Sequence, residues 1–165
     1  DLRWLTALVS DTGMRLGEGA GLLKRDIILD ADIPHISLKP HPWRPLKTSV
    51  SQRLIPLIGA SIWAAQRISK AFPDSPYAFP RYNRKDTTNS NSASAALNKW
   101  LHQYVPDGCT MHSFRHSMRD RLRAVECPSD VIDQIGGWAT EGVGQRYGKG
   151  YELKVCARWM KLISA

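Results

Sequence analysis

The sequence predicts a mainly α-helical fold with a small three-stranded antiparallel β-sheet, and two observations carry this prediction. Apolar residues recur every three or four positions along several stretches, as they do on the buried face of a helix. Three short runs, IILDAD, PHISLKP and RLIPLIG, are instead rich in β-branched residues and bounded by proline, aspartate and glycine, which is typical of strands.

Length and composition predict one compact unit. The chain has 165 residues, of which 42% are hydrophobic, so it is long enough to bury a core. It contains no recognisable internal repeat and no sign of a second domain. We therefore expect residues 1–165 to form a single domain, and, because the numbering begins without methionine, a fragment of a longer protein.

The N-terminal half predicts two helices followed by the sheet. The first helix, over residues 2–9, should end or be interrupted at residues 11–13, and a second helical piece should run from about residue 16 to 23. Arg15 lies at the junction between them. Lys47 falls in the connection that precedes the third strand.

A helix over about residues 60–72 precedes a stretch rich in proline, asparagine and serine, residues 73–94. We expect this stretch to be a long exposed loop. It carries a basic group of three residues: Arg81, Arg84 and Lys85.

The C-terminal half predicts four helices. Asn91 or Ser92 should cap a helix that continues through Tyr104. The other three are expected over residues 111–125, 129–135 and 153–163, the second of them ending at Gly136-Gly137, where glycine can take the left-handed conformation.

The charge balance indicates a polyanionic partner. The chain carries 23 Lys and Arg against 15 Asp and Glu, which gives a formal net charge of +8 and a pI near 9.7. Because each phosphate neutralised by a cation releases counterions, such an excess favours nucleic acid. A solvated basic surface without a specific partner would have the same composition.

Several other classes of protein are disfavoured. The sequence has no run of eighteen apolar residues and no secretory signal pattern, so we expect a cytoplasmic protein with no membrane partner. Cys109, Cys127 and Cys156 are odd in number and never in C-x-x-C, which favours neither a disulfide framework nor a zinc knuckle. The sequence also holds neither a P-loop nor an acidic metal cluster, and we expect no cofactor and no metal.

The stretch MHSFRHSMRDRLRAV, residues 111–125, is the most basic of the expected helices. Its apolar residues form one stripe, so His112 and Arg115, three positions apart, should project together elsewhere and could grip one anion. Alternatively, its cations are solvated or paired with Asp120 and Glu126. A zinc site on its two histidines would lack the glutamate of H-E-x-x-H and any obvious third ligand.

Five motifs follow one another along the chain: TGMRLGE, LKTSVSQRLIPL, HSFRH, IGGWAT and GVGQRYGKGY. Together they resemble the catalytic domain of the tyrosine recombinases, also called phage integrases. The family pattern is an Arg followed three residues later by an acid, a Lys in a sheet turn, H-x-x-R, Gly followed by His or Trp, and a Tyr nine residues later. The matching positions are Arg15 with Glu18, Lys47, His112 with Arg115, Gly137-Trp138, and Tyr147.

The resemblance covers nearly the whole chain and implies the fold of the DNA breaking-rejoining catalytic domain. It implies a site-specific DNA recombinase that cuts and rejoins a strand through a 3′-phosphotyrosine. Prophage or mobile-element integration and excision are the expected settings. No motif is specific alone, but five in the right order are.

Each matched residue suits one need of phosphodiester cleavage. Arg15 and Arg115 would clamp the two non-bridging oxygens, since guanidinium forks match phosphate and stay charged. Lys47 would protonate the leaving 5′ oxygen, and His112 would accept the tyrosine proton or help to hold the phosphate. Tyr147 would attack phosphorus.

Other residues are expected to support the site. Trp138 offers an indole N–H and an apolar body, but not the acid–base chemistry of the histidine found there in relatives; it could equally be a core aromatic. Glu18 would orient Arg15 or His112, or else be an ordinary helix-face acid, and His116 would support the site by hydrogen bonding, or else be buried. DNA contacts are expected from Arg81, Arg84, Lys85 and Arg119.

Alternatives remain at two positions and for the function. Tyr151 is the rival nucleophile, and Lys24 and Lys39 are the rivals of Lys47. A non-enzymatic DNA-binding module would place the helix over residues 111–125 in a major groove. It would use Arg115, Arg119, Arg121 and Arg123. A type IB topoisomerase is a more distant alternative.

The resemblance also implies partners. These are double-stranded DNA and other protomers, four of which assemble on two duplexes, while the chain alone is expected to be a monomer. Family members carry a separate N-terminal DNA-binding domain, which is not visible here, so we expect this chain to bind DNA weakly. The last helix, LKVCARWMKLI, would dock on a neighbour or pack in cis.

Overall fold

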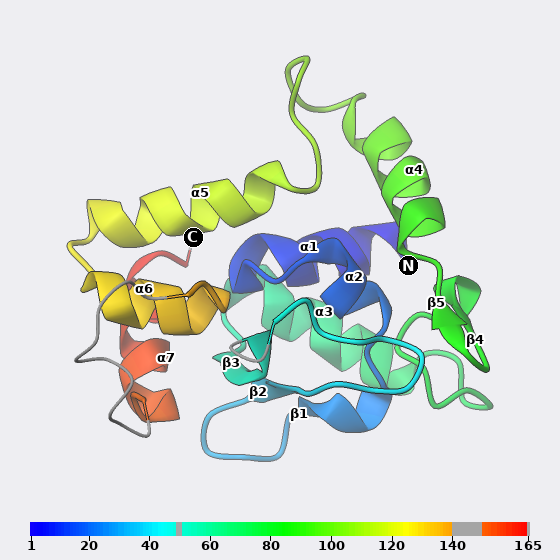
Figure 1. Ribbon diagram of the computed structural model, residues 1–165, viewed down its shortest axis with the longest axis horizontal. Coiled ribbons are helices and arrows are strands. Elements are labelled where there is room, and N and C mark those ends of the chain that lie inside the picture. The colour runs from blue at the N-terminus through cyan, green and yellow to red at the C-terminus, as the bar shows by residue number, and fades with distance from the viewer. Residues whose placement is uncertain (49–50, 140–149, 165) are drawn as a thin grey trace.

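The structure is a computed structural model that describes residues 1–48, 51–139 and 150–164 (Figure 1). Its α-helices are α1 (Leu2–Thr12), α2 (Leu16–Ala20), α3 (Gly59–Lys70), α4 (Ser90–Leu101), α5 (Ser113–Ala124), α6 (Ser129–Gly136) and α7 (Leu153–Leu162). Its strands are β1 (Ile27–Ile28), β2 (His35–Leu38), β3 (Arg53–Pro56), β4 (Asn83–Arg84) and β5 (Thr87–Thr88), and single 3₁₀ turns occur at η1 (Lys24–Asp26) and η3 (Pro80–Tyr82). The prediction of a mainly helical chain with a three-stranded antiparallel sheet is confirmed.

Helix α1 lies at the centre of the helical part, with α3 on one side and α5 on another. Leu5 and Leu8 of its apolar face are fully buried. The helix ends at Gly13, whose left-handed φ of 62° lets its N–H close on the carbonyl of Val9. A side chain at Gly13 would also collide with Met118 of α5, so this close approach requires glycine.

The main sheet has the order β1-β2-β3, and both pairs are antiparallel. Its register places Ile36 opposite both Ile27 and Ile55, and all three side chains are buried. Helix α7 packs against β3, and the end of α6 also contacts this strand (Figure 1). The start of β3 therefore lies where the sheet and the C-terminal helices meet.

The expectation of an exposed loop over residues 73–94 is wrong. This stretch contains η3, the β4–β5 hairpin and the first turn of α4, and Phe79 and Tyr82 within it are buried. The Asn83 side chain donates to the carbonyl of Ala20 at 2.7 Å, which ties the hairpin to the end of α2. Two apolar aromatic side chains in a polar stretch were enough to fold it onto the core.

Helix α4 differs from its predicted bounds at both ends. Its cap is Asn89, whose Oδ1 accepts from the N–H of Ser92 at 2.9 Å, and not Asn91 or Ser92. Several Ser and Asn residues here can cap a helix, so the sequence did not single out one. The helix also ends before Tyr104, which is exposed.

The last helix, α7, packs in cis, with Cys156 and Met160 buried against the rest of the fold. The three cysteines, Cys109, Cys127 and Cys156, are free thiols. Within the described ranges, no helix is long and apolar enough to cross a membrane.

Candidate active site

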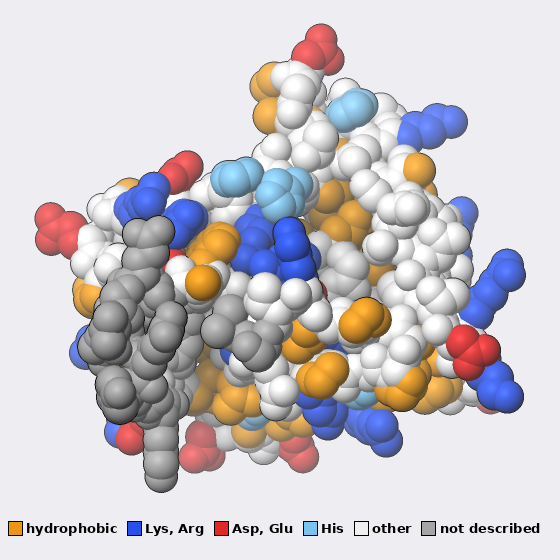
Figure 2. All heavy atoms as spheres, viewed as in Figure 1, with side chains coloured by type: hydrophobic (Ala, Val, Ile, Leu, Met, Phe, Trp, Pro, Cys, Tyr) orange, Lys and Arg blue, Asp and Glu red, His pale blue; other side chains and the backbone are white. Residues whose placement is uncertain are grey.

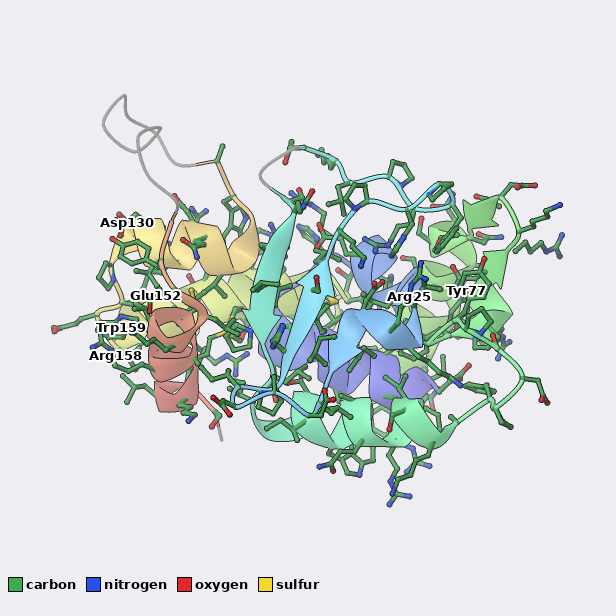
Figure 3. The ribbon with its side chains drawn as sticks, turned by 90° about the horizontal axis from the view of Figure 1, so that it is seen from below. Arg25, Tyr77, Asp130, Glu152, Arg158 and Trp159 are labelled. Atoms are coloured by element: carbon green, nitrogen blue, oxygen red, sulfur yellow. The ribbon has the colours of Figure 1, made fainter. Side chains whose placement is uncertain are left out.

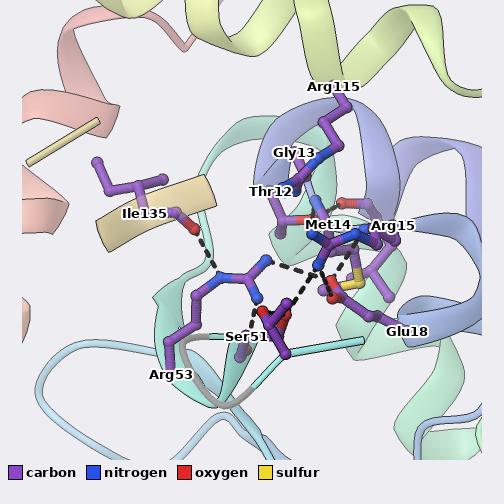
Figure 4. Close-up of polar contacts among 11 residues, drawn as sticks. Thr12, Gly13, Met14, Arg15, Glu18, Ser51, Arg53, Arg115 and Ile135 are labelled. Carbon is purple, nitrogen blue, oxygen red and sulfur yellow. Dashed lines mark hydrogen bonds and ion pairs between the residues drawn. The ribbon is translucent and has the colours of Figure 1, made fainter. Parts of the chain in front are cut away.

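The junction between α1 and α2 builds the first half of the site. Arg15 is the N-terminal cap residue of α2, and Glu18, one turn later, folds back so that its Oε2 accepts from the Arg15 backbone N–H at 2.9 Å. The other carboxylate oxygen pairs with the Arg15 guanidinium at 2.7 Å. The same guanidinium nitrogen donates to Ser51 Oγ at 3.0 Å, so Glu18 and Ser51 together fix Arg15 (Figure 4).

Arg53, at the start of β3, shares the carboxylate of Glu18 at 3.2 Å. Its other nitrogens donate to the backbone carbonyls of Ile135 at 2.8 Å and Ser51 at 2.6 Å. Arg53 and Glu18 are both buried. Every guanidinium nitrogen of Arg53 therefore has an acceptor, and this side chain joins α2, β3 and α6 (Figure 4).

The carboxylate of Glu18 balances two cations. Burial alone would raise its pKa, but the charge of Arg53 and the hydrogen bonds from Arg15 outweigh burial and hold the pKa below its ordinary value. Glu18 thus stays ionised. Glu18 contacts Arg15, one of the two residues that it was expected to orient. Its other side-chain partner is Arg53, in place of His112.

Arg115, in the first turn of α5, enters the site from the opposite side. It is buried, and one terminal nitrogen donates to the carbonyl of Gly13 at 2.7 Å. The other terminal nitrogen has no hydrogen-bond partner among the residues that the structure describes. Burial, followed by the charges of Arg15 and Arg53, lowers the pKa of Arg115 to about 10. The group is still a cation near neutral pH, and it faces other cations.

His112, just before α5, is exposed above these arginines. Partial burial and the neighbouring His116, whose ring meets it edge to face at 4.9 Å, lower its pKa, and the charges of Arg115, Arg15 and Lys47 add to this. All three predicted cations are therefore close enough to act on one imidazole. Figure 2 shows histidine side chains beside a group of Lys and Arg side chains near the middle of one face.

A cleft of about 280 Å³ adjoins this group. Arg115 and His112 form part of its wall, together with residues of α2 and α4. Its polar wall is made largely of neutral hydroxyl and amide groups: Ser90, Asn91, Ser94, Asn98 and Thr110. An anion that reached the unpaired nitrogen of Arg115 would lie beside groups able to donate further hydrogen bonds.

Trp138 follows α6 and lies between two guanidiniums. Its ring centroid is 4.3 Å from the Cζ of Arg115 and 4.7 Å from the Cζ of Arg119, and Arg119 also pairs with Asp133 at 3.1 Å. The turn before it needs Gly137, because φ is +63° and a side chain there would strike Arg53. Trp138 packs against the core and also contacts the guanidinium of Arg115, so a role in the site stays a prediction.

Some predicted residues lie elsewhere. Tyr147 falls outside the described residues. The exposed cations of the β4–β5 region, Arg81, Arg84 and Lys85, belong to an edge of the fold distant from α6 (Figure 1). His116 is exposed, which excludes the alternative that it is buried.

The rival lysines are engaged elsewhere. Lys24 donates to the carbonyl of Phe72 at 2.6 Å, and Lys39 lies 3.7 Å from Asp26. Neither contact belongs to the arginine group. The choice of Lys47 over them stays a prediction, which the effect of the Lys47 charge on the pKa of His112 favours.

Sequence reasoning missed Arg53 and Ser51. A signal for Arg53 was present, because alternate residues of a strand share a face and Arg53 shares one with buried Ile55. A charged side chain on the inner face of a strand needs a buried partner. That partner is Glu18, 35 positions earlier, and no local pattern reveals such a pairing.

Within the described residues, no group of three or more His, Cys, Asp or Glu side chains could hold a metal ion. The fold and the site define a class of protein. Its members are mainly helical with a small sheet, and basic side chains from motifs far apart in the sequence lie together in one site. The model of the phage integrase family matches residues 1–152. The chain belongs to that family, as its motifs predicted.

Relatives come from mobile elements. The chain is 27% identical over 153 residues to transposase B from transposon PsiTn554 of Staphylococcus aureus and 26% identical to transposase B from transposon Tn554 of S. aureus strain Mu50. Each match covers 87% of this chain and 24% of the relative, so the chain spans about a quarter of the length of these proteins.

A solved structure has the same fold. It is the Tn1549 transposon integrase (residues 82–397) in complex with circular intermediate DNA, and it matches with a TM-score of 0.58 and 17% identity. The match covers 87% of this chain and 56% of that one. The fold predicted from the motifs is confirmed.

Proposed function

We propose that this chain is the catalytic domain of a site-specific DNA recombinase that integrates or excises a mobile element. Membership of the phage integrase family, transposase relatives and the fold shared with a transposon integrase support this proposal. The chain would act as one domain on double-stranded DNA, in the cytoplasm, with further protomers joining it on the DNA.

One observation carries the proposal. Arg15 and Arg115 come from motifs a hundred positions apart, yet the Arg115 guanidinium donates at 2.7 Å to the carbonyl of Gly13, two residues before Arg15, and the charge of Arg15 adds to burial in lowering the pKa of Arg115. Arg115 also has a terminal nitrogen without a partner in the described part of the chain. Two like charges placed together inside a fold cost free energy, and an anion between them would offset that cost. A phosphate of DNA meets this need.

The remaining groups suit the chemistry of strand cleavage. The Tyr147 phenolic oxygen would form a bond to phosphorus while the bond from phosphorus to the 5′ oxygen breaks. The leaving oxygen would take a proton from Lys47. His112, whose lowered pKa keeps it neutral near pH 7, would accept the phenolic proton. Attack by a 5′ hydroxyl on the phosphotyrosine would reverse these steps and rejoin a strand.

The alternative of a non-enzymatic reader of the major groove is less well supported, because α5 has few free cations. Arg115 is buried, and Arg119 pairs with Asp133. Arg121 donates to the carbonyls of Ser10 and Ile163. Of the four arginines that a groove-binding module would use, only Arg123, 3.8 Å from Asp120, is highly exposed. Three of the four arginines of that interpretation therefore make contacts within the fold.

A suicide substrate tests the proposal. A duplex that carries the recombination site and a nick loses its 5′ hydroxyl fragment after cleavage, so the covalent complex accumulates and is visible on a denaturing gel. We expect the full-length protein to form this complex and Tyr147→Phe to form none. A complex that persists in Tyr147→Phe would exclude Tyr147 as nucleophile, and no complex with the wild type would favour the binding module.

A further inference from the structure

The second candidate nucleophile, Tyr151, is engaged by α6. Its hydroxyl donates to Asp130 Oδ2 at 2.5 Å, and this hydrogen bond raises the pKa of the phenol. Asp130 lies in the first turn of α6, beside the start of α7 (Figure 3). The Tyr151 hydroxyl is thus engaged by a residue of α6, and this contact points to a different role for Tyr151.

The backbone of Tyr151 is held as well. The Gln134 side-chain amide donates to the Tyr151 carbonyl at 2.7 Å, and its Oε1 accepts from the Tyr151 N–H at 2.7 Å. One side chain thus satisfies both backbone groups of a single residue. With the Asp130 contact, three hydrogen bonds fasten Tyr151 to one helix.

The residue before Tyr151 fits this arrangement. Gly150 has a left-handed φ of +73°, and a Cβ added to it would lie 2.8 Å from Gln134 Oε1. A glycine at this position therefore lets the chain approach the Gln134 side chain closely. The glycine at position 150 and the hydrogen bonds of Tyr151 therefore both attach this part of the chain to Gln134 of α6.

The described residues on either side of positions 140–149 are held by α6. On the N-terminal side, the Trp138 ring contacts the guanidiniums of Arg115 and Arg119, and the Trp138 backbone N–H donates to the carbonyl of Asp133. On the C-terminal side, Gly150 is next to the anchored Tyr151. Because an extended chain advances at most ~3.6 Å per residue, the link between positions 147 and 151 spans at most ~14 Å.

We propose that Asp130 and Gln134 are positioning residues, which anchor Tyr151 to α6 and thereby set how far Tyr147 can reach toward the arginines of the same chain. This inference rests on the proposed function, because it takes Tyr147 as the nucleophile. Both act through Tyr151, the residue that their side chains contact. A Tyr151 held in place would restrict the positions open to a nucleophile four residues earlier in the chain.

Single-turnover cleavage of the suicide duplex by the full-length protein tests the anchor. At saturating protein, we expect Gln134→Ala to slow formation of the covalent complex about tenfold, while the Kd for DNA and the Tm stay unchanged. Gln66→Ala, on an exposed position of α3, is the matched control and should cleave at the wild-type rate.

A conservative pair separates positioning from general structure. Asp130→Ala removes the acceptor of the Tyr151 hydroxyl and should slow cleavage several-fold, whereas Asp130→Asn keeps an oxygen acceptor and should restore most of the rate. Tyr151→Phe should match Asp130→Ala, because both lose the same hydrogen bond, and the double variant should be no slower than either.

The leaving group supplies a further readout. A duplex with sulfur in place of the bridging 5′ oxygen releases a thiolate, which needs no proton donor because a thiol has a pKa near ~8.5. This substrate should rescue Lys47→Ala but not Gln134→Ala, since the anchor acts on the nucleophile.

Two results separate the anchor from the function. A wild-type rate in Gln134→Ala, or rescue of that variant by the sulfur substrate, would overturn the anchor and leave the recombinase intact. If the wild type forms no covalent complex with either substrate, the proposed function fails and the positioning role fails with it.

Discussion

Two arginines from opposite sides of the site are both buried and differ in how their donors are used. Arg53, at the start of β3, donates from all three nitrogens to Glu18, Ser51 and Ile135. Arg115, at the start of α5, donates to Gly13 and leaves one terminal nitrogen without a partner in the described part of the chain. Burial alone therefore does not distinguish a structural cation from a binding cation.

The difference lies in the counter-charge. Glu18 pairs with Arg53 at 3.2 Å and with Arg15 at 2.7 Å, whereas no salt bridge to Arg115 is found among the described residues. A buried donor left unsatisfied costs about 1–3 kcal/mol. A fold can retain such an unsatisfied donor when a bound ligand accepts its hydrogen bond and offsets the cost. The guanidinium donors on the β3 side are satisfied within the fold, whereas one donor of Arg115 on the α5 side is not satisfied within the described residues.

The comparison predicts that Arg53→Met has the largest effect on stability. The substitution keeps an apolar stem but leaves the carbonyls of Ile135 and Ser51 without their donor and Glu18 with one cation instead of two. We expect a loss of about 3–5 kcal/mol in the free energy of unfolding, the usual cost of breaking a buried ion pair. Urea denaturation followed by circular dichroism measures it, with the exposed Arg67→Met as control. A loss below ~1 kcal/mol would mean that Arg53 is not the structural member of the pair.

The matched change, Arg115→Met, should reverse the pattern. Loss of the Gly13 hydrogen bond is offset by relief of repulsion from Arg15 and Arg53, so we expect the free energy of unfolding to change by no more than about 1 kcal/mol. Cleavage of the suicide duplex should fall by about 10²–10³-fold, as when one preorganised donor to a transition state is removed. If Arg115→Met unfolds the protein as Arg53→Met does, the distinction between the two arginines is lost.

A third change tests whether Trp138 supports Arg115 or only fills space. Cation–π contacts contribute about 0.5–2 kcal/mol, so Trp138→Leu should slow cleavage by about tenfold and Trp138→Phe by less, because phenylalanine keeps an aromatic face. Single-turnover rates on the same duplex measure both. Equal rates for the two variants would assign Trp138 to packing alone.

Helix positions, the three-stranded sheet and the order of the site motifs could be predicted, because each depends on local periodicity or on spacing along the chain. Arg53 could not be assigned, because its importance comes from Glu18 and Ile135, which local patterns do not connect to it. The exposed-loop prediction for residues 73–94 failed for a related reason. Its polar composition gave no weight to Phe79 and Tyr82, whose burial depends on the packing of distant elements.

For His112 we expect a smaller effect, on the pH dependence of the cleavage rate. Burial, then His116 and Arg115, lower the pKa of His112. The imidazole therefore stays neutral, and able to accept a proton, at pH values below its ordinary pKa near ~6.5. Cleavage should therefore hold its rate as the pH falls past that value and decline only at lower pH. His116→Ala removes one of the causes and should move this decline to higher pH. A decline that stays in place would show that His116 does not act on His112.

The smallest effect is expected at the β4–β5 hairpin, where Arg84 and Lys85 are exposed and carry no structural ion pair within the described residues. If they contact DNA phosphates, the double change to alanine removes up to two contacts. The slope of log K against log salt should then fall in magnitude by about 0.9 per contact. Affinity at physiological salt should weaken only several-fold, and Lys161→Ala on α7 is the control. An unchanged slope would mean that Arg84 and Lys85 neutralise no phosphate, and it would confine DNA contact to the side of α5 and β3. The slope shows this because it reports the number of phosphates neutralised and not the total charge of the protein.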